Sequence, residues 1–378
     1  MEMGLIASEF DQCIKCGLCL ANCPVNHALF LEKYTPRGKI QLARRYGRNE
    51  ATITDHYRDI FYKCLLCGAC NVTCPSGVDL TEVFTHMRQE IFEKKGITPA
   101  MKPALDSLMT CHNISREDNE ERGDWREDIV DLPDHGYRKQ KAGLVYFVGC
   151  VASFFPMAQT IPQNMVQILS AADVDFTILA GDEWCCGFPL IGAGAKDKMD
   201  EFVAHNVEKV HSLGAENVAF SCPSCYRMWR EHYPNDFNLL HTTQLIEQLI
   251  DKKALSFNEL PWSVTYHDPC DLGRNGGEYD APRKILGAIP GLELIEMENN
   301  RAGSVCCGGG GNLEMTDPAL SGSLSKKRIE DIRKTGAEKV VTACQQCVRT
   351  LKSQTRREKL DLEVMDITTV VARALSNV

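Results

Sequence analysis

Several features that would assign this chain of 378 residues to other protein classes are missing from its sequence. The first residues, MEMGLIASEFDQ, lack the basic stretch and long apolar core of a secretory signal peptide. The longest apolar run, GLVYFVGCVASFFPMA, is too short to span a membrane and is broken by Gly, Cys, Ser and Pro. We therefore expect a cytoplasmic protein that is peripheral to a membrane only through a partner.

Positive charge is also in short supply. The chain has 42 Lys and Arg residues against 51 Asp and Glu residues, a formal net charge of −9. Because nucleic-acid binding needs a basic face, this balance argues against nucleic acid as the main partner. The glycine run Gly308 to Gly311 has no GxGxxG register and no following GK[ST], so we expect close backbone packing there and no bound nucleotide.

Cysteine, in contrast, is abundant. The chain has 19 cysteines within an otherwise ordinary composition, 44% hydrophobic and 25% charged. In a reducing cytosol such cysteines are metal ligands or redox groups more often than structural disulfides. A secreted disulfide framework is disfavoured because no export signal is visible and the spacings are regular.

The cysteines of the first hundred residues form one motif that occurs twice. CIKCGLCLANCPV (residues 13–25) and CLLCGACNVTCPS (residues 64–76) share the spacing C-x₂-C-x₂-C-x₃-C-P. In two-cluster ferredoxins the first three thiolates bind one [4Fe–4S] cube and the fourth binds the other cube. The predicted ligand sets are Cys13, Cys16, Cys19 and Cys74 for one cube, and Cys64, Cys67, Cys70 and Cys23 for the other. Zinc knuckles are the alternative, but zinc does not explain three-plus-one ligands, twice, with proline both times.

Helices are predicted between and after these motifs. Thr35-Pro36 has the form of a helix start, and further helices are expected over residues 51–62 and 79–96. A basic patch in the same region is either a solvated face or a docking surface for an acidic redox partner. The patch comprises Lys33, Arg37, Lys39, Arg44, Arg45 and Arg48.

A charged segment follows this region. Residues 115–131, SREDNEERGDWREDIVD, lack apolar periodicity and are predicted to be a linker or a surface excursion. Cys111, just before this segment, matches no pattern and is expected to be a free thiol.

After residue 140 the sequence repeats itself. In each half a strand-like run ends in one cysteine, a CCG tripeptide follows, and a CxxC ends another strand-like run. The first half has Cys150, Cys185, Cys186, Cys222 and Cys225, and the second has Cys270, Cys306, Cys307, Cys344 and Cys347. Equivalent cysteines lie 120 to 122 positions apart, so the halves are an internal duplication.

Strand-like and helical runs alternate in both halves, which predicts two α/β lobes with short parallel sheets. Helices are expected over residues 195–213 and 316–335, and ligands should gather at the carboxyl ends of the strands. The predicted fold class is α+β and multi-domain. Its parts are a mostly helical two-cluster domain (1–100), a charged linker (101–141), a first lobe (142–260) and a second lobe (261–378).

Five cysteines in each lobe exceed the four thiolates that a cubane cluster needs. One member of each vicinal pair could bridge irons while its neighbour binds terminally. A zinc site in one lobe is an alternative, and a vicinal disulfide is another, although it does not account for the other three cysteines.

This duplicated pattern behind a two-cluster ferredoxin module resembles the CCG-domain family, over nearly the whole chain apart from the linker. The family includes heterodisulfide reductase catalytic subunits and the iron–sulfur subunits of glycolate, lactate and glycerol-3-phosphate oxidoreductases. The resemblance implies that each complete five-cysteine set holds a noncubane [4Fe–4S] cluster, so the chain would carry one or two of these. In heterodisulfide reductases the substrate disulfide is cleaved between two such clusters. Asp271 departs from the family's frequent HDPCHL form.

The resemblance implies an oxidoreductase subunit, similar to heterodisulfide reductase, in a hetero-oligomeric complex. No flavin or nicotinamide motif is visible, so single electrons must pass to or from flavin-containing or other redox subunits, with a disulfide as a candidate substrate. The first alternative is a pure conduit between a flavoprotein dehydrogenase and a quinone-side or ferredoxin acceptor. The second is a non-catalytic metal-binding scaffold. His267 and Asp268, just before Cys270, are either structural residues or hydrogen-bond donors near a cluster.

Overall fold

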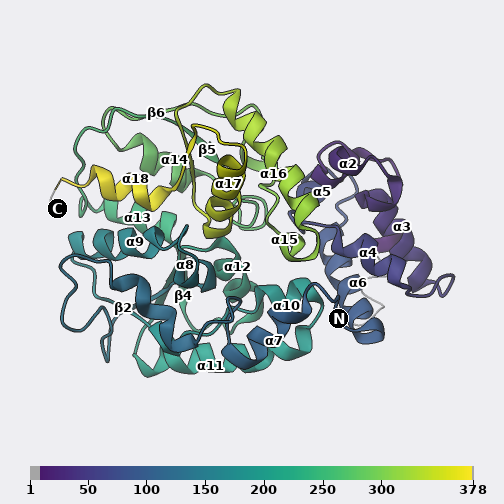
Figure 1. Cartoon of the computed structure of the whole chain (residues 1–378), viewed down its shortest axis with the longest axis horizontal. Coiled ribbons are helices and arrows are strands. Elements are labelled where there is room, and N and C mark those ends of the chain that lie inside the picture. Colours follow the sequence, from purple (N-terminus) through teal and green to yellow (C-terminus); the bar gives the residue numbers. More distant parts are fainter. Residues whose placement is uncertain (1–8, 377–378) are drawn as a thin grey trace.

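The computed structural model describes residues 9–376, which form a helical N-terminal module beside two α/β lobes. In Figure 1 the N-terminal module lies to the right, the first lobe below and the second lobe above. No described helix is both long and apolar enough to cross a membrane. The α+β fold class and the two α/β lobes predicted from the sequence are confirmed.

The N-terminal module is held together by short helices around the two cysteine motifs. They are α2 (Pro24–Leu29), α3 (Pro36–Gly47), α4 (Asp55–Tyr62), α5 (Ala69–Val72) and α6 (Leu80–Lys95). Thr35 caps α3 by accepting a hydrogen bond from the Gly38 amide, as its sequence predicts. Asp79 caps α6 in the same way, and Gly96 ends that helix. The helix expected over 51–62 begins only at Asp55.

The two lobes contain four-stranded parallel sheets with the same strand order. The first sheet has the order β2-β1-β3-β4 and the second β6-β5-β7-β8. The strands of the first are β1 (Leu144–Phe147), β2 (Phe176–Ile178), β3 (Asn217–Phe220) and β4 (Asn238–His241). Those of the second are β5 (Ser263–His267), β6 (Glu293–Leu294), β7 (Lys339–Thr342) and β8 (Glu363–Asp366). The matching orders bear out the internal duplication. β4 and β8 were not predicted.

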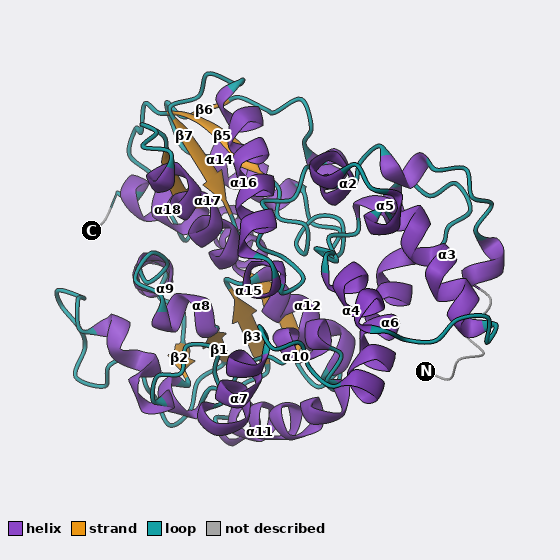
Figure 2. Cartoon of the chain, turned by 45° about the vertical axis from the view of Figure 1, so that its right-hand side comes forward, coloured by secondary structure: helices purple, strands orange, loops and turns teal. Residues whose placement is uncertain are grey.

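Helices cover both sheets, as Figure 2 shows by secondary structure. In the first lobe they are α8 (Cys150–Phe154), α9 (Thr160–Ala171), α10 (Phe188–Ala193), α11 (Met199–Ser212), α12 (Pro223–His232) and α13 (Thr242–Asp251). In the second they are α14 (Asp280–Gly287), α15 (Leu313–Thr316), α16 (Pro318–Arg333), α17 (Gln345–Arg357) and α18 (Ile367–Ala374). Since both faces are covered, the central strands are apolar along their length, as in β1, whose four residues are all buried.

The charged segment before the first lobe is not an exposed connector. It follows α7 (Lys102–Cys111) and contains a 3₁₀ helix, Asn119–Arg126. Within that helix Trp125 and Arg122 are each only 1% exposed. Trp125 belongs to the hydrophobic core of the lobes, so the segment packs on the first lobe despite its charge.

One buried arginine ties the N-terminal module to both lobes. Arg88 on α6 is fully buried, and its guanidinium donates to the carbonyls of Phe61 and Cys64 within the module. The same group donates at 2.8 Å to the carbonyls of Gly192 in the first lobe and Gly311 in the second. A buried guanidinium needs such acceptors, and here they come from three parts of the chain.

Candidate metal centres

The first ferredoxin motif and the last cysteine of the second motif line one small cavity. Its lining includes Cys13, Cys16, Cys19 and Cys74, the first ligand set expected from the spacing. Burial and the neighbouring thiols Cys13, Cys16 and Cys74 raise the pKa of Cys19 to about 11. A metal cluster relieves this crowding because it binds the cysteines as thiolates, so the donor set fits one.

The second set is brought together in the same crossed manner and lies deeper. Its cavity is lined by Cys23, Cys64, Cys67 and Cys70. Cys67 and Cys70 are buried, whereas Cys16 of the first set is exposed. Burial is the largest cause that raises the pKa of Cys23 to about 12. The first set therefore faces solvent and the second faces the interior of the molecule.

One residue of the predicted basic patch, Lys39, is buried, so the prediction is wrong for it, and two others are paired with carboxylates. Lys39 is only 1% exposed, and its ammonium donates to the carbonyls of Tyr34 and Lys63 beneath the second set. Burial lowers the pKa of Lys39. Arg37 pairs with Glu32 and Arg48 with Asp11, each at 2.8 Å. Lys39 lies on the inward face of α3, next to buried Ile40, which its charge alone could not reveal.

In the first lobe all five predicted cysteines are buried. Cys150 begins α8 after β1, the vicinal pair lies between β2 and α10, and Cys222 and Cys225 lie at the start of α12 after β3. This is the carboxyl edge of a parallel sheet, where α/β folds place their sites. Cys225 lies near the loop of the vicinal pair, as shown by the hydrogen bonding to Cys186 that, together with Cys222 of its own motif, raises the pKa of Cys225.

A buried ion pair from outside the cysteine pattern supports this site. Arg122 places its Nη2 3.4 Å from the Cys150 sulfur and its Nη1 2.8 Å from Glu183 Oε1. Glu183 also accepts from the amides of Val148 and Gly149, so the pair holds the end of β1 against the loop of the vicinal cysteines. Sequence reasoning missed Arg122 because it lies in the charged segment, where no motif marks it.

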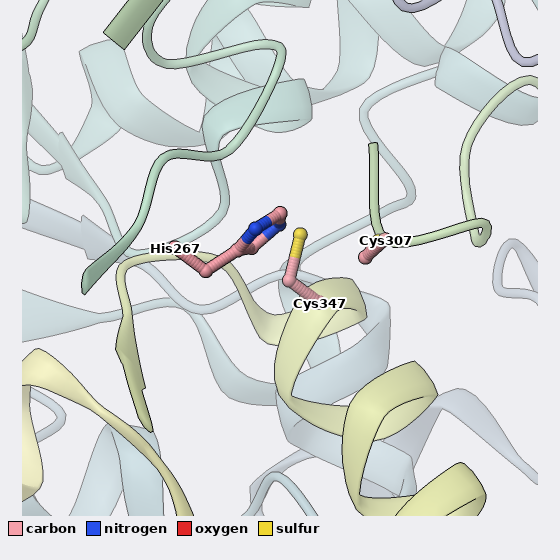
Figure 3. A group of neighbouring side chains, drawn as sticks. All are labelled: His267, Cys307 and Cys347. Atoms are coloured by element: carbon pink, nitrogen blue, oxygen red, sulfur yellow. The ribbon is translucent and has the colours of Figure 1, made fainter. Parts of the chain in front are cut away.

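The second lobe repeats the arrangement with one chemical difference. His267, at the end of β5, lies with Cys307 and Cys347, and one ligand atom from each of the three falls within 4.8 Å of the others. Figure 3 shows the imidazole beside the Cys347 sulfur, with Cys307 on the facing loop. Arg328 Nε donates to His267 Nδ1 at 3.1 Å, whereas His267 Nε2 has no hydrogen-bond partner among the described residues. The equivalent residue of the first lobe is Phe147.

Asp268, the other candidate beside Cys270, has a structural environment. Its carboxylate pairs with Arg283 at 2.8 Å and accepts from the Arg301 amide. These contacts tie the loop before Cys270 to α14 and to the loop that precedes the second CCG tripeptide. Of the two candidates, His267 therefore faces the cysteines and Asp268 fixes the loop.

The second ferredoxin set touches the second lobe directly. Cys67 and Cys306 lie within hydrogen-bonding reach, and this contact is the largest cause that lowers the pKa of Cys67 to about 6. Arg274 donates to the Cys67 carbonyl at 2.8 Å and to the Ser304 carbonyl. A Cβ added to Gly311 would lie 2.5 Å from the Cys64 carbonyl, so the glycine run packs closely against the ferredoxin loop.

The two lobes also exchange residues at their cysteine loops. Gln345, inside the second CxxC, donates to the Val148 carbonyl and Ser221 Oγ and accepts from the Ala152 amide of the first lobe. In the reverse direction, Asp271 accepts from Ser224, inside the first CxxC, at 2.6 Å. The departure from the family form at Asp271 thus lies at the junction of the lobes.

The cysteine loops of the two lobes also interact electrostatically. The Cys222 thiol of the first lobe is among the causes that raise the pKa of Cys344 to about 11, after a lowering contact with Cys347 and a raising effect of burial. Because Gln345, inside the second CxxC, also donates to Ser221, which directly precedes Cys222, the two CxxC motifs lie close to one another across the lobe boundary. Cys111 ends α7, with its sulfur 3.5 Å from Thr110 Oγ1.

Comparisons with known proteins match both parts of the chain. A cysteine-rich domain model, CCG, matches residues 144–230 and 264–352, and a 4Fe-4S dicluster domain model matches residues 9–78. One subunit of the dihydromethanophenazine:CoB--CoM heterodisulfide reductase of Methanosarcina acetivorans is 32% identical over 97% of this chain and 94% of its own length. The EtfAB:quinone oxidoreductase of Syntrophomonas wolfei is 26% identical over 97% of this chain and 58% of its own length. One subunit of the fumarate reductase (CoM/CoB) of Methanothermobacter marburgensis is 26% identical over 97% of this chain and 72% of its own length.

Proposed function

The chain belongs to the family of CCG cysteine-rich-domain proteins that carry a 4Fe-4S dicluster domain, and from this premise we propose that it reduces a disulfide within a larger oxidoreductase complex. Its relatives include subunits of oxidoreductases and proteins named only as iron–sulfur proteins. The finer assignment is supported by the complete set of five cysteines in both lobes, whose cysteine loops meet through the bonds of Gln345 with Ser221 and of Ser224 with Asp271. Two complete sites on either side of one boundary suit a substrate that is split into two halves.

In this proposal the eight ferredoxin cysteines would hold two cubane clusters as crossed sets. The five cysteines of each lobe would hold a noncubane [4Fe–4S] cluster. The exposed set around Cys16 is suited to receive electrons, and the contact of Cys67 with Cys306 would connect the deeper set to the second lobe. Electrons would therefore reach the second lobe before the first. Two electrons and two protons convert one disulfide into two thiols, and the electrons arrive singly from another protein of the complex.

Hydrogen bonds and an ion pair within this chain hold the cysteine loops in place. The Arg122–Glu183 pair fixes the loop of Cys150, and Gln345 and Asp271 lock the two lobes in register. His267 Nε2 is directed at Cys307 and Cys347 without another partner among the described residues, so it is suited to donate a hydrogen bond to ligand sulfur.

The test is turnover by the anaerobically isolated chain, with reduced viologen as electron donor and a series of thiol heterodisulfides as acceptors. We expect viologen oxidation that depends on one heterodisulfide and is lost in Cys347→Ser. Cys111→Ser, which removes the cysteine outside all motifs, is the matched control and should retain activity.

A conduit without its own substrate is the second candidate, favoured by the similarity to the EtfAB:quinone oxidoreductase. The same experiment separates the two. Viologen that reduces all clusters spectroscopically, with no disulfide consumed by a chain of full iron content, would reject disulfide reduction and favour the conduit.

A further inference from the structure

A basic cavity lies between the two lobes, away from the cysteine loops. Its volume is about 460 Å³, within the range of sites for small molecules. Thr160 and Asn164 of α9 line it from the first lobe, and α17, β8 and α18 line it from the second. Asn164 donates to Thr369 Oγ1 at 2.9 Å, which holds α9 against α18. In Figure 1 these two helices lie on the side opposite the N-terminal module.

Cations dominate the lining although the whole chain is acidic. They are Lys352, Arg356, Lys359 and Arg373, against a single carboxylate, Glu363. Glu363 is already engaged, since one oxygen lies 2.9 Å from Lys339 and the other 3.8 Å from Arg373. Within the described part of the chain, the Lys352 ammonium donates only to the Met157 carbonyl. The side chains of Arg356 and Lys359 have no hydrogen-bond or ion-pair partner among residues 9–376.

Two of these cations, Lys352 and Arg356, lie on one side of α17, whereas Lys359 follows the end of that helix and Arg373 lies on α18. Lys352 and Arg356 are four residues apart, a spacing at which like charges repel on a helix. Burial, and then the charge of Arg356, lowers the pKa of Lys352. Like charges held close together at a cavity repel one another, and an anion bound between them would reduce this repulsion.

The cavity is closed off from the cysteines. The same side of α17 begins near Cys344 and continues through Val348, which is 1% exposed. Val348 packs with Val151, Ala158 and Ile161 of the first lobe into a separate hydrophobic cluster. This cluster lies between the cysteine loops and the basic cavity, so a ligand bound in the cavity does not reach the cysteine sulfurs.

We propose that this cavity binds a small polyanion, a molecule that carries phosphate or several carboxylates. Its anionic groups would be held by Lys352, Arg356 and Lys359, and its rim contacts would come from Thr160 and Asn164 of the other lobe. Because both lobes line the cavity, the ligand bridges them, and its binding stabilises the arrangement in which the two CxxC loops lie close to one another. The inference does not depend on the proposed reaction.

Calorimetric titration of the full, cluster-loaded chain with inorganic pyrophosphate tests this proposal, with citrate as a second arm. Sulfate at equal ionic strength serves as the reference for non-specific charge effects. We expect saturable binding of one ligand per chain and a higher midpoint of thermal unfolding. The arm that binds more tightly identifies phosphate or carboxylate as the favoured group.

The double variant Arg356→Gln/Lys359→Gln should weaken binding at least tenfold, since it removes two charged donors. Both residues are exposed, so the fold should tolerate the change. Arg333→Gln/Arg357→Gln removes the same charge at exposed positions outside the lining and should bind like the original chain. Absence of saturable binding in the original chain, or an equal loss in the control pair, would overturn the proposal.

Discussion

Two arginines that no motif marks donate hydrogen bonds to cysteines of the predicted sites. Arg122 donates to the Cys150 sulfur from 28 positions away, and Arg274 donates to the Cys67 carbonyl from 207 positions away. The cysteines themselves could be predicted because their spacing encodes which thiols share a cluster. The arginines could not, because only tertiary packing brings them to the sulfurs. Arg122 is neutralised by Glu183, whereas Arg274 has no acidic partner within 4.0 Å in the described part of the chain.

Arg274 should control the step from the ferredoxin module into the second lobe. Its charge stabilises the more negative, reduced state of both neighbouring clusters, so Arg274→Gln should lower their midpoint potentials by tens of millivolts. For one electron about 59 mV corresponds to a tenfold change in equilibrium constant. Redox titration followed by electron paramagnetic resonance measures these potentials.

Arg301→Gln is the matched control for this measurement. Arg301 is nearly half exposed and its side chain pairs with Asp280, so its removal should leave both potentials unchanged. Equal shifts in the two variants, or none in Arg274→Gln, would show that Arg274 has only a packing role.

At the scale of elements, helix starts were predictable where a capping residue marks them. Thr35 caps α3, as the sequence pattern indicates, and the helix expected over residues 79–96 begins after Asp79, which caps α6. The strands β4 and β8 were missed because their sequences, NLLH and EVMD, have polar residues at both ends and only two apolar residues between them. Their residues become strands by pairing with the central strands β3 and β7, which is a tertiary effect.

The two ferredoxin loops should exchange their fourth ligands. Cys23→Ser is expected to damage the cluster held by Cys64, Cys67 and Cys70 and to spare the cluster held by Cys13, Cys16 and Cys19, since Cys23 lines the cavity of the former. Iron analysis with Mössbauer or paramagnetic resonance spectra of the variant distinguishes the two clusters. Loss of the solvent-facing cluster instead would reverse the assignment.

The cap of α13 should make the chain sensitive to acid. His241 accepts from the Thr243 amide, and burial lowers the pKa of His241 to about 3, below its ordinary value near 6.5. Well above pH 6.5 the imidazole is neutral in the folded and the unfolded chain, so the free energy of unfolding does not depend on its protonation. Below that pH only the unfolded chain takes up the proton, so stability falls by about 1.4 kcal/mol between pH 7.5 and 5.5.

Denaturant unfolding of the original chain and of His241→Gln at these two pH values isolates this contribution, because the variant cannot titrate there. The stability advantage of the original chain should shrink by that amount at pH 5.5. A constant difference between the two chains would mean that the imidazole is not held neutral by burial.

At the scale of the whole molecule, the sequence predicted the parts but not how they meet. The duplication implied two equivalent lobes, and the matching sheet orders agree. It did not show that Cys67 of the ferredoxin module would contact Cys306 and not the first lobe. Nor did it show that Gln345 and Asp271 would cross between lobes, because neither residue belongs to a recognisable pairing pattern.

Under the proposed function, the contacts between parts would give electrons an ordered route from the exposed Cys16 set through the buried Cys67 set to the second lobe and then to the first. The central claim is that both five-cysteine sites at the end of this route hold iron. His267, Cys307 and Cys347 would also suit zinc, which accepts nitrogen and sulfur ligands. Zinc therefore competes with iron most directly at the second lobe.

Metal and acid-labile sulfide analysis of anaerobically purified chain tests this claim most directly. Four clusters predict about sixteen irons per chain, with as many sulfides and no stoichiometric zinc. About twelve irons with one zinc would contradict the claim for one lobe, and about eight irons would contradict it for both.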